Sequence, residues 1–173
     1  MKIFNLSALS SLRKRCGSWR GERGFTLIEL IVVVAIMGIL LGVGLPSFRS
    51  MVINMRIKNA SFDFYASLLA ARSEAMTRNT AVTITPVSGA FNNGWNVTAV
   101  IASVTTTLKS QDAFPAGLAF SGAPASIVYN SSGRLNTAVT PITIYASGAS
   151  GGSVGRCVTL DLSGRPATAK GIC

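Results

Sequence analysis

Few residues of this chain are of the types that perform catalysis or bind metals. The sequence contains no histidine, which excludes Ser-His-Asp and Cys-His catalytic arrangements and imidazole metal ligands. The acidic residues after the first apolar segment are widely spaced and lack motif context: Asp63, Glu74, Asp112 and Asp161. We therefore predict no catalytic residues, no metal site and no cofactor, and we expect a structural or interaction protein rather than an enzyme.

Two cysteines near the end of the chain, Cys157 and Cys173, form an even pair. Two free thiols or a metal pair are the alternatives to a disulfide, but zinc sites normally need histidine or a second cysteine pair. A disulfide would suit a protein sent to an oxidising compartment. It would close a loop of about 15 residues, worth on the order of 3 kcal/mol in the chain-entropy model.

Glu29 is a carboxylate inside a long apolar segment. Residues 25–45 are apolar apart from this residue, Thr26 and glycines. Roughly 20 such residues in a helix, at about 1.5 Å each, span the hydrocarbon core of a bilayer. A charge there costs about 2.5–3.5 kcal/mol at mid-depth and less near the interface. Glu29 either reaches the lipid headgroups or pairs with a cation on a partner.

The segment before residue 25 is basic, with six Lys or Arg residues against the single Glu22. Short basic flanks remain in the cytoplasm, so the segment after the apolar run is expected to be exported. A secretory signal peptide has a shorter apolar core and a small-residue cleavage site after it. Neither feature is present here, which favours a retained membrane anchor.

The basic segment followed by Gly24, Phe25 and Glu29 in register resembles the cleavage and assembly signal of type IV pilins and type II secretion pseudopilins. The resemblance implies cleavage by the prepilin peptidase after Gly24 and N-methylation of Phe25. It also implies that Glu29 pairs with the free amine of a neighbouring subunit's first residue. A costly charge that a partner neutralises would favour docking in register.

Three further stretches resemble the GspH/FimT family of minor pilins and minor pseudopilins. They are Ala71-Arg72-Ser73-Glu74-Ala75, which Arg78 follows, the dipeptide Gly94-Trp95, and the turn at residues 129–134. The resemblance implies a subunit of a type IV pilus or a type II secretion pseudopilus, at or near its tip. Its partners would be other major or minor pilins or pseudopilins. It would be a single-pass inner-membrane protein with a periplasmic carboxyl-terminal domain, later incorporated into the filament.

Hydrophobic spacing predicts an α+β, pilin-like fold. Apolar residues at helical spacing form one face of a helix that continues beyond the membrane to a stop at Asn79-Thr80. These residues are Ile53, Ile57, Ala60, Phe64, Leu68, Ala71 and Ala75. Gly42, Gly44 and Pro46 are expected to weaken the helix between its two halves. Alternating β-rich stretches then predict antiparallel strands near 81–85, 95–100, 103–108, 127–129, 142–145 and 157–162. Trp95 is expected in the core, and residues 146–153 are expected to form a loop.

These elements divide the chain into four predicted parts. Residues 1–24 are the cleaved leader and 25–46 the transmembrane and assembly helix. Residues 47–79 are its amphipathic continuation, and 80–173 form the periplasmic β-rich domain.

Basic residues near the end of the chain raise an alternative function, double-stranded DNA binding for uptake in natural transformation. The formal charge of +10 falls to +5 without the leader. Some DNA-binding FimT proteins carry a Gly-Arg motif in the loop before the final cysteine, which Gly164-Arg165 resembles, although Ala167 replaces their second Arg. The residues proposed to contact phosphates are Arg165, Lys170, Arg156 and Arg134. The alternative is a β-turn at Pro166 with ordinary surface charge in the loop 162–170.

Overall fold

The computed structural model describes residues 24–147 and 154–173. The predicted leader, apart from its last residue, and most of the predicted loop at 146–153 lie outside these residues. The chain separates into two compact units, Met1–Gly42 and Val43–Cys173, and each is described by itself.

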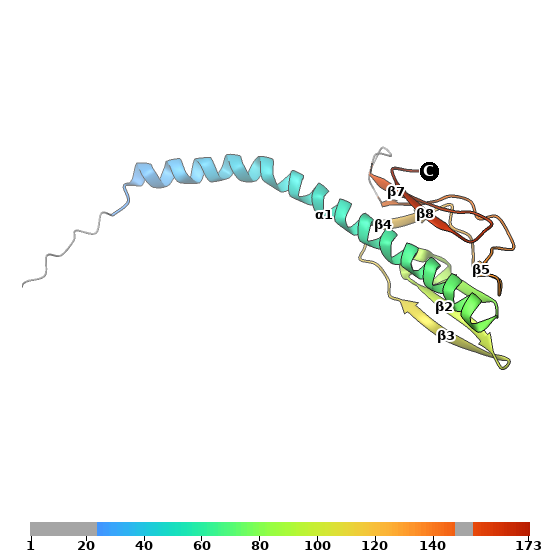
Figure 1. Ribbon diagram of the computed structural model, residues 1–173. Coiled ribbons are helices and arrows are strands. Elements are labelled where there is room, and N and C mark those ends of the chain that lie inside the picture. Colours follow the sequence, from blue (N-terminus) through green and yellow to red (C-terminus); the bar gives the residue numbers. More distant parts are fainter. Residues whose placement is uncertain (1–23, 148–153) are drawn as a thin grey trace, which may run out of the picture. The chain divides into compact units, whose positions relative to one another are not determined.

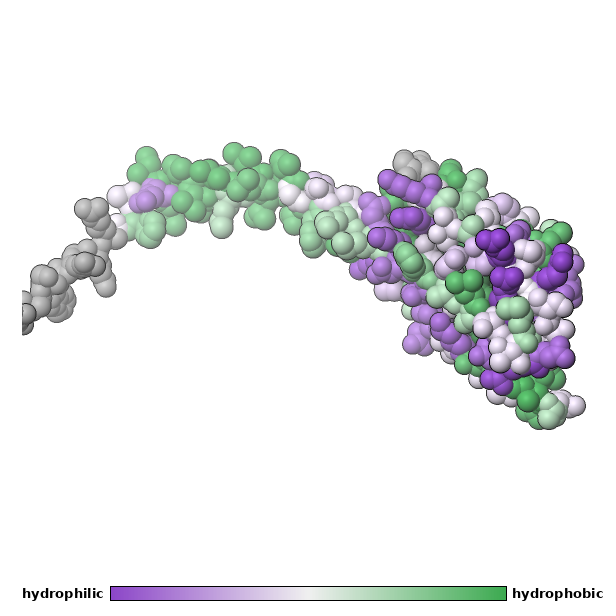
Figure 2. All heavy atoms as spheres, in the orientation of Figure 1, coloured by the Kyte–Doolittle hydropathy of each residue, from purple (hydrophilic) through white to green (hydrophobic). Residues whose placement is uncertain are grey.

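The helix α1, Leu27–Arg78, contains 52 residues and continues through Pro46. Its amino-terminal part is covered by exposed apolar side chains, which Figure 2 shows as a hydrophobic coat. By length and composition α1 is able to cross a membrane, with a mean hydropathy of 2.7 in an 18-residue window. The first unit therefore has the properties predicted for a membrane anchor.

The predicted stop of the helix is confirmed at Asn79. This residue has a φ of 50°, the left-handed conformation that commonly ends helices. The next amide, that of Thr80, donates a hydrogen bond to the carbonyl oxygen of Ala75 at 3.2 Å. The last turn of α1 is thereby closed before the first strand begins.

One face of α1 is buried in the second unit. Six of the seven predicted core positions are buried, from Ile57 to Ala75, together with Ser61 and Ser67. The prediction for Ile53 is wrong, because its side chain is 40% exposed. The buried face begins one turn later, at Ile57.

In the part of the chain that the structure describes, eight strands follow the helix and form two antiparallel sheets (Figure 1). The first sheet has the order β3-β2-β1-β5, with β1 Val82–Pro86, β2 Trp95–Ile101, β3 Val104–Gln111 and β5 Ile127–Tyr129. The second has the order β4-β6-β7-β8, with β4 Leu118–Ser121, β6 Ile142–Ala146, β7 Gly155–Leu160 and β8 Pro166–Lys170. The short 3-10 turns Val87–Gly89 and Phe91–Asn93 connect β1 to β2. The predicted antiparallel architecture is confirmed, with two sheets.

Some predicted strand boundaries near the end of the chain are wrong. The strand expected at 157–162 is β7, Gly155–Leu160, and Leu162 is an exposed turn residue. The predicted loop at 162–170 is a turn followed by β8. Strand β8 is an edge strand with only its first residue buried, so it lacks the alternating pattern by which strands are recognised. Strand β4 was not predicted from the sequence either.

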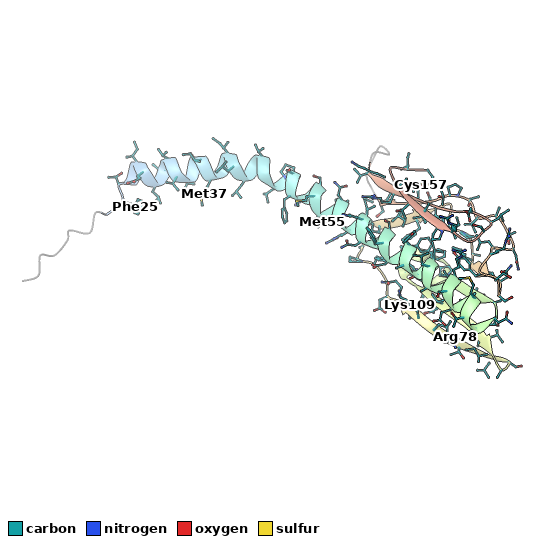
Figure 3. All side chains as sticks on the ribbon, viewed as in Figure 1. Phe25, Met37, Met55, Arg78, Lys109 and Cys157 are labelled. Atoms are coloured by element: carbon teal, nitrogen blue, oxygen red, sulfur yellow. A yellow bond between two sulfur atoms is a disulfide. The ribbon has the colours of Figure 1, made fainter. Side chains whose placement is uncertain are left out.

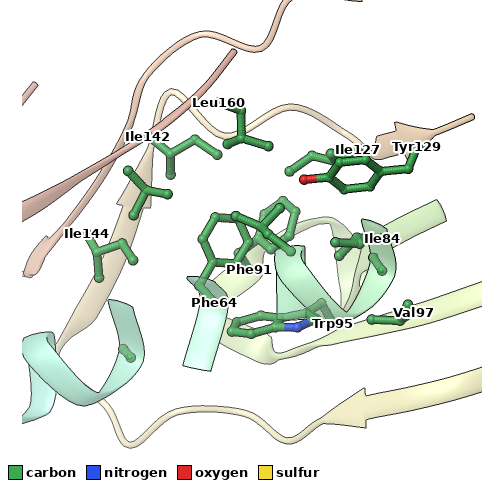
Figure 4. Packing of buried hydrophobic residues seen from close by; sticks show 14 of the residues in the cluster. Phe64, Ile84, Phe91, Trp95, Val97, Ile127, Tyr129, Ile142, Ile144 and Leu160 are labelled. Carbon is green, nitrogen blue, oxygen red and sulfur yellow. The ribbon is translucent and has the colours of Figure 1, made fainter. Parts of the chain in front are cut away.

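The core joins α1 to both sheets and is centred on aromatic residues (Figure 4). Phe64 of α1 meets Phe91, Trp95 and Phe120 edge-on, with ring centroids 5.2–5.8 Å apart. Edge-to-face contacts of this kind add about 0.5–1.5 kcal/mol to the burial energy. Trp95 is fully buried, which confirms its predicted place in the core.

A disulfide connects Cys157 of β7 to Cys173, with the two Cα atoms 5.0 Å apart (Figure 3). The amide of Cys173 donates a hydrogen bond to the hydroxyl of Thr143 on β6 at 3.1 Å. Because β6 and β7 are neighbours, these two contacts fix the end of the chain across the second sheet.

Candidate functional site

The motif at the start of α1 is arranged as a helix amino-terminal cap. The Glu29 amide donates a hydrogen bond to the Thr26 hydroxyl at 3.3 Å, and the Leu30 amide donates to the Thr26 carbonyl oxygen at 3.2 Å. A Thr followed three residues later by Glu is the sequence of a capping box, which satisfies amides that the first helical turn leaves unpaired. Thr26 thus accounts for where α1 begins.

The carboxylate of Glu29 takes no part in the hydrogen bonds of this cap. The amide of Glu29 makes the hydrogen bond described above, and the side chain is exposed. Within residues 24–147 and 154–173, the ion pair that forms is between Glu74 and Arg78. In the described chain the Glu29 carboxylate therefore remains available to a cation from outside.

Two turns of the same construction carry two of the four predicted DNA-contacting residues. They are Asn130-Ser131-Ser132-Gly133-Arg134 and Asp161-Leu162-Ser163-Gly164-Arg165, which we call the twin turns. In both, the Gly amide donates to the carbonyl oxygen of the first residue, at 2.8 and 2.9 Å. In both, Oδ1 of the first residue accepts from the Arg amide, at 3.0 and 2.9 Å. The same local chemistry therefore builds both turns.

The twin turns pack directly on one another. A Cβ atom placed on Gly164 would lie 2.1 Å from the carbonyl oxygen of Gly133, so the backbones meet where a side chain would stand. The Leu135 amide donates to the Leu162 carbonyl oxygen at 3.2 Å, and Arg72 Nε donates to the Gly133 carbonyl oxygen at 3.0 Å. The exposed residues Arg134 and Arg165 follow these two glycines and lie in adjoining turns.

Two titratable groups lie at the twin turns. The Ser163 hydroxyl and the Arg165 amide donate to Asp161, which lowers the pKa of this carboxyl. Burial raises the pKa of Tyr129, against an opposing effect of Arg72. The Tyr129 hydroxyl points into the apolar core (Figure 4) and has no hydrogen-bond partner among the described residues.

The other two predicted DNA-contacting residues lie elsewhere. Arg156 and Lys170 are cross-strand partners at the opposite end of the β7–β8 hairpin from the turn that carries Arg165. They line a groove with Lys58 of α1. The four predicted cations therefore form two separate pairs. Sequence reasoning missed Lys58, and it also missed the repeated Ser-Gly-Arg of the twin turns, which is visible in the sequence.

Two models of known protein families match this chain. The profile described as type II transport protein GspH matches residues 60–164, more than half of the chain. The chain belongs to the GspH family. The prokaryotic N-terminal methylation motif also matches, over residues 19–45. The predicted family is thereby confirmed, and in this GspH-family chain the methylation motif includes the helix cap formed by Thr26.

Solved structures of related fold include a minor pilin and a minor pseudopilin. The type IV minor pilin FimU of Pseudomonas aeruginosa is 24% identical, with a TM-score of 0.56 over 65% of this GspH-family chain and 87% of FimU. The minor pseudopilin EPSH from the type II secretion system of Vibrio cholerae is 17% identical, with a TM-score of 0.51 over 69% of this chain and 96% of EPSH. These likenesses confirm the pilin-like fold.

Proposed function

We propose that this chain is a minor pilin or minor pseudopilin that assembles with other pilins or pseudopilins through α1. The observation that carries the proposal is the methylation motif at the head of an exposed apolar helix in a member of the GspH family. Residues 25–46 anchor the chain in the inner membrane and the domain at 80–173 faces the periplasm. The subunit acts at or near the filament tip.

Prepilin peptidase cleaves the chain after Gly24, and Phe25 is then N-methylated. Two features of the described chain support this step. Gly24 precedes the first helical residue, so the scissile bond is not enclosed in a helix. Phe25 is 81% exposed, which leaves the new amino terminus accessible to a methyl donor and to a partner subunit.

Glu29 directs assembly by pairing with the amino terminus of a neighbouring subunit. Its carboxylate has no ion-pair partner within the described residues. An unpaired carboxylate in a bilayer is costly, and a neighbour's amine removes this cost only when the two helices are in register. The charge therefore favours one docked position over free diffusion.

Two substitutions separate the charge of Glu29 from the polarity of its side chain. Glu29→Gln removes the charge and keeps a polar side chain of similar size, whereas Glu29→Leu removes both the charge and the polarity. The hydrogen bond from the amide of position 29 to Thr26 is kept in each variant. We expect both variants to insert into the membrane and neither to enter the filament, measured by membrane fractionation and by immunoblots of purified filaments. If Glu29→Gln assembles normally, the charge is not needed and the pairing with the amine is wrong.

The filament that contains this subunit is identified by mass spectrometry of pili sheared from cells. Peptides that begin at methylated Phe25 in that material would identify a pilus subunit. Their absence from sheared pili, with the cleaved form retained in the inner membrane, would identify a secretion pseudopilin.

The twin turns support a second function, sequence-independent binding of double-stranded DNA. Arg134 and Arg165 are exposed in adjoining turns of fixed geometry, and Arg side chains contact phosphates through paired donors. DNA binding of this kind weakens as salt concentration rises. The carboxylate of Asp161, close to Arg165, opposes it.

Two double variants that remove equal charge test the DNA function. In the detergent-solubilised chain we expect Arg134→Gln with Arg165→Gln to weaken duplex DNA binding at least about tenfold, because two phosphate contacts are lost. The loss of these contacts should also lower the dependence of binding on salt concentration. Arg56→Gln with Lys109→Gln, at exposed positions outside the twin turns and outside the candidate phosphate contacts, is the matched control and should retain binding. Equal losses from both pairs would mean that net charge, and not the twin turns, attracts the DNA.

A further inference from the structure

A groove of about 550 Å³ runs between α1 and the β7–β8 hairpin within the second unit. Its helical wall carries four polar residues at helical spacing: Ser47, Ser50, Asn54 and Lys58. Its opposite wall contains Arg156 and Lys170. In Figure 3, Met55 marks the helical wall and Cys157 marks β7, the strand that carries Arg156.

The groove is positively charged. Lys58, Arg156 and Lys170 all line it, and no Asp or Glu is among the described residues that line it. None of these three cations takes part in the ion pair that forms within the described chain. The two walls come from segments about a hundred residues apart in the sequence, so the fold has gathered this charge without neutralising it. Such a groove favours an anionic ligand.

The groove begins immediately after the apolar run of α1. Leu45 is the last residue of that run, and the helical wall extends from Ser47 to Lys58. At about 1.5 Å per residue, this wall lies roughly 3–20 Å beyond the end of the run. The polar headgroup layer of a bilayer occupies roughly the first 5–8 Å beyond its hydrocarbon core. Ser47 and Ser50 therefore lie within the depth of this layer, whereas Lys58 begins beyond it. Helical side chains lean toward the amino terminus, so the long side chain of Lys58 extends back toward the layer.

We propose that this groove binds the phosphate headgroup of an anionic phospholipid in the membrane that α1 crosses. Arg156 presents paired N–H donors to phosphate oxygens, the two lysines add charge, and Ser47 offers a hydroxyl donor. The bound lipid holds the domain at the membrane surface until the subunit enters the filament. The inference rests on the proposed membrane anchoring.

The test uses the full chain in lipid nanodiscs that contain equal parts of phosphatidylglycerol and phosphatidylcholine. Native mass spectrometry after release from the discs measures which phospholipid remains bound. The groove variant combines Lys58→Gln, Arg156→Gln and Lys170→Gln. The matched control combines Arg56→Gln, Lys109→Gln and Arg134→Gln, which removes the same charge from exposed positions outside the groove, one of them on α1.

We expect the unaltered chain and the control to retain phosphatidylglycerol in preference to phosphatidylcholine. The groove variant should lose this preference by about tenfold or more, because each Lys or Arg near an anionic surface contributes about fivefold. An equal loss in the control, or no preference in the unaltered chain, would overturn the inference. So would displacement of the lipid by equimolar inorganic phosphate or duplex DNA. Failure of the chain to insert into the discs would instead contradict the membrane anchoring.

Discussion

Gly133 and Gly164 lie back to back, and a Cβ atom on Gly164 would stand 2.1 Å from the Gly133 carbonyl oxygen. This contact holds the twin turns together, and each glycine directly precedes an exposed arginine. Both glycines have positive φ angles, 68° and 79°, so each is required by its own turn as well. The relative position of Arg134 and Arg165 is therefore set by a contact between backbones, not by their own side chains.

Substitution of Gly164 by Ala should destabilise the fold far more than the same change at Gly171. Both positions have positive φ, 79° and 109°, so Ala is strained at each by about 1–2 kcal/mol. A Cβ on Gly171 meets no atom within 4 Å, whereas one on Gly164 clashes with the Gly133 backbone. Overpacking of this kind adds about 1–3 kcal/mol. Urea unfolding of both variants measures the difference in the free energy of unfolding. Equal losses of stability would mean that the contact between the twin turns does not stabilise the fold.

Asp161→Asn should preserve its turn, and Asp161→Ala should not. Asn130 already performs the same role in the twin turn, where its Oδ1 accepts from the Arg134 amide. We expect the melting temperature of the Asn variant at pH 7 to match that of the unaltered chain, and that of the Ala variant to be lower. A melting temperature of the Ala variant equal to that of the Asn variant would show that this side chain does not hold the turn.

The same pair of variants predicts a dependence on acid. The pKa of Asp161 is lowered in the folded chain by the Ser163 hydroxyl and the Arg165 amide. Its contribution to stability is therefore present above the ordinary aspartate pKa of about 3.9 and is lost as the pH falls through the lowered value. Asn at this position does not titrate. Melting curves below about pH 4 should show the unaltered chain losing stability relative to the Asn variant.

The helix and the twin turns show how far sequence reasoning reaches. The buried face from Ile57 to Ala75 was predictable because helical periodicity depends only on spacing along one element. The strand β8 was not, because an edge strand exposed on both faces carries no such period. Boundaries of short strands depend on their neighbours, which the sequence does not display.

The grouping of the cations was also beyond the sequence. Arg165 and Lys170 are close in sequence, but Arg165 directly precedes strand β8 and Lys170 is its last residue, so they lie at opposite ends of the strand. Lys170 instead pairs across the sheet with Arg156, and both share a groove with Lys58. Such contacts between distant segments depend on sheet register, which motif matching does not provide.

Removal of the disulfide should destabilise the second unit and release the end of the chain. Cys157 and Cys173 are 16 positions apart, and closure of such a loop is worth about 3 kcal/mol in the chain-entropy model. We expect the double variant Cys157→Ser with Cys173→Ser to lose about this much in urea unfolding. Hydrogen exchange of the amide at position 173, which bonds to the Thr143 hydroxyl, should become faster. Exchange at an unchanged rate would mean that this hydrogen bond holds the terminus without the disulfide.

Tyr129→Phe should leave stability at neutral pH unchanged or raise it by up to about 1 kcal/mol. The Tyr129 side chain is fully buried and its hydroxyl has no partner among the described residues, so the substitution removes an unsatisfied polar atom without emptying the site. Burial raises the pKa of this phenol above its ordinary value of about 10. The unfolded chain therefore loses the proton more readily than the folded chain, and the free energy of unfolding falls as the pH rises above about 10. A phenylalanine side chain has no proton to lose, so the variant should resist alkaline unfolding. Urea unfolding at about pH 8 and about pH 11 distinguishes the two chains, and an identical decline in both would show that Tyr129 does not control alkaline stability.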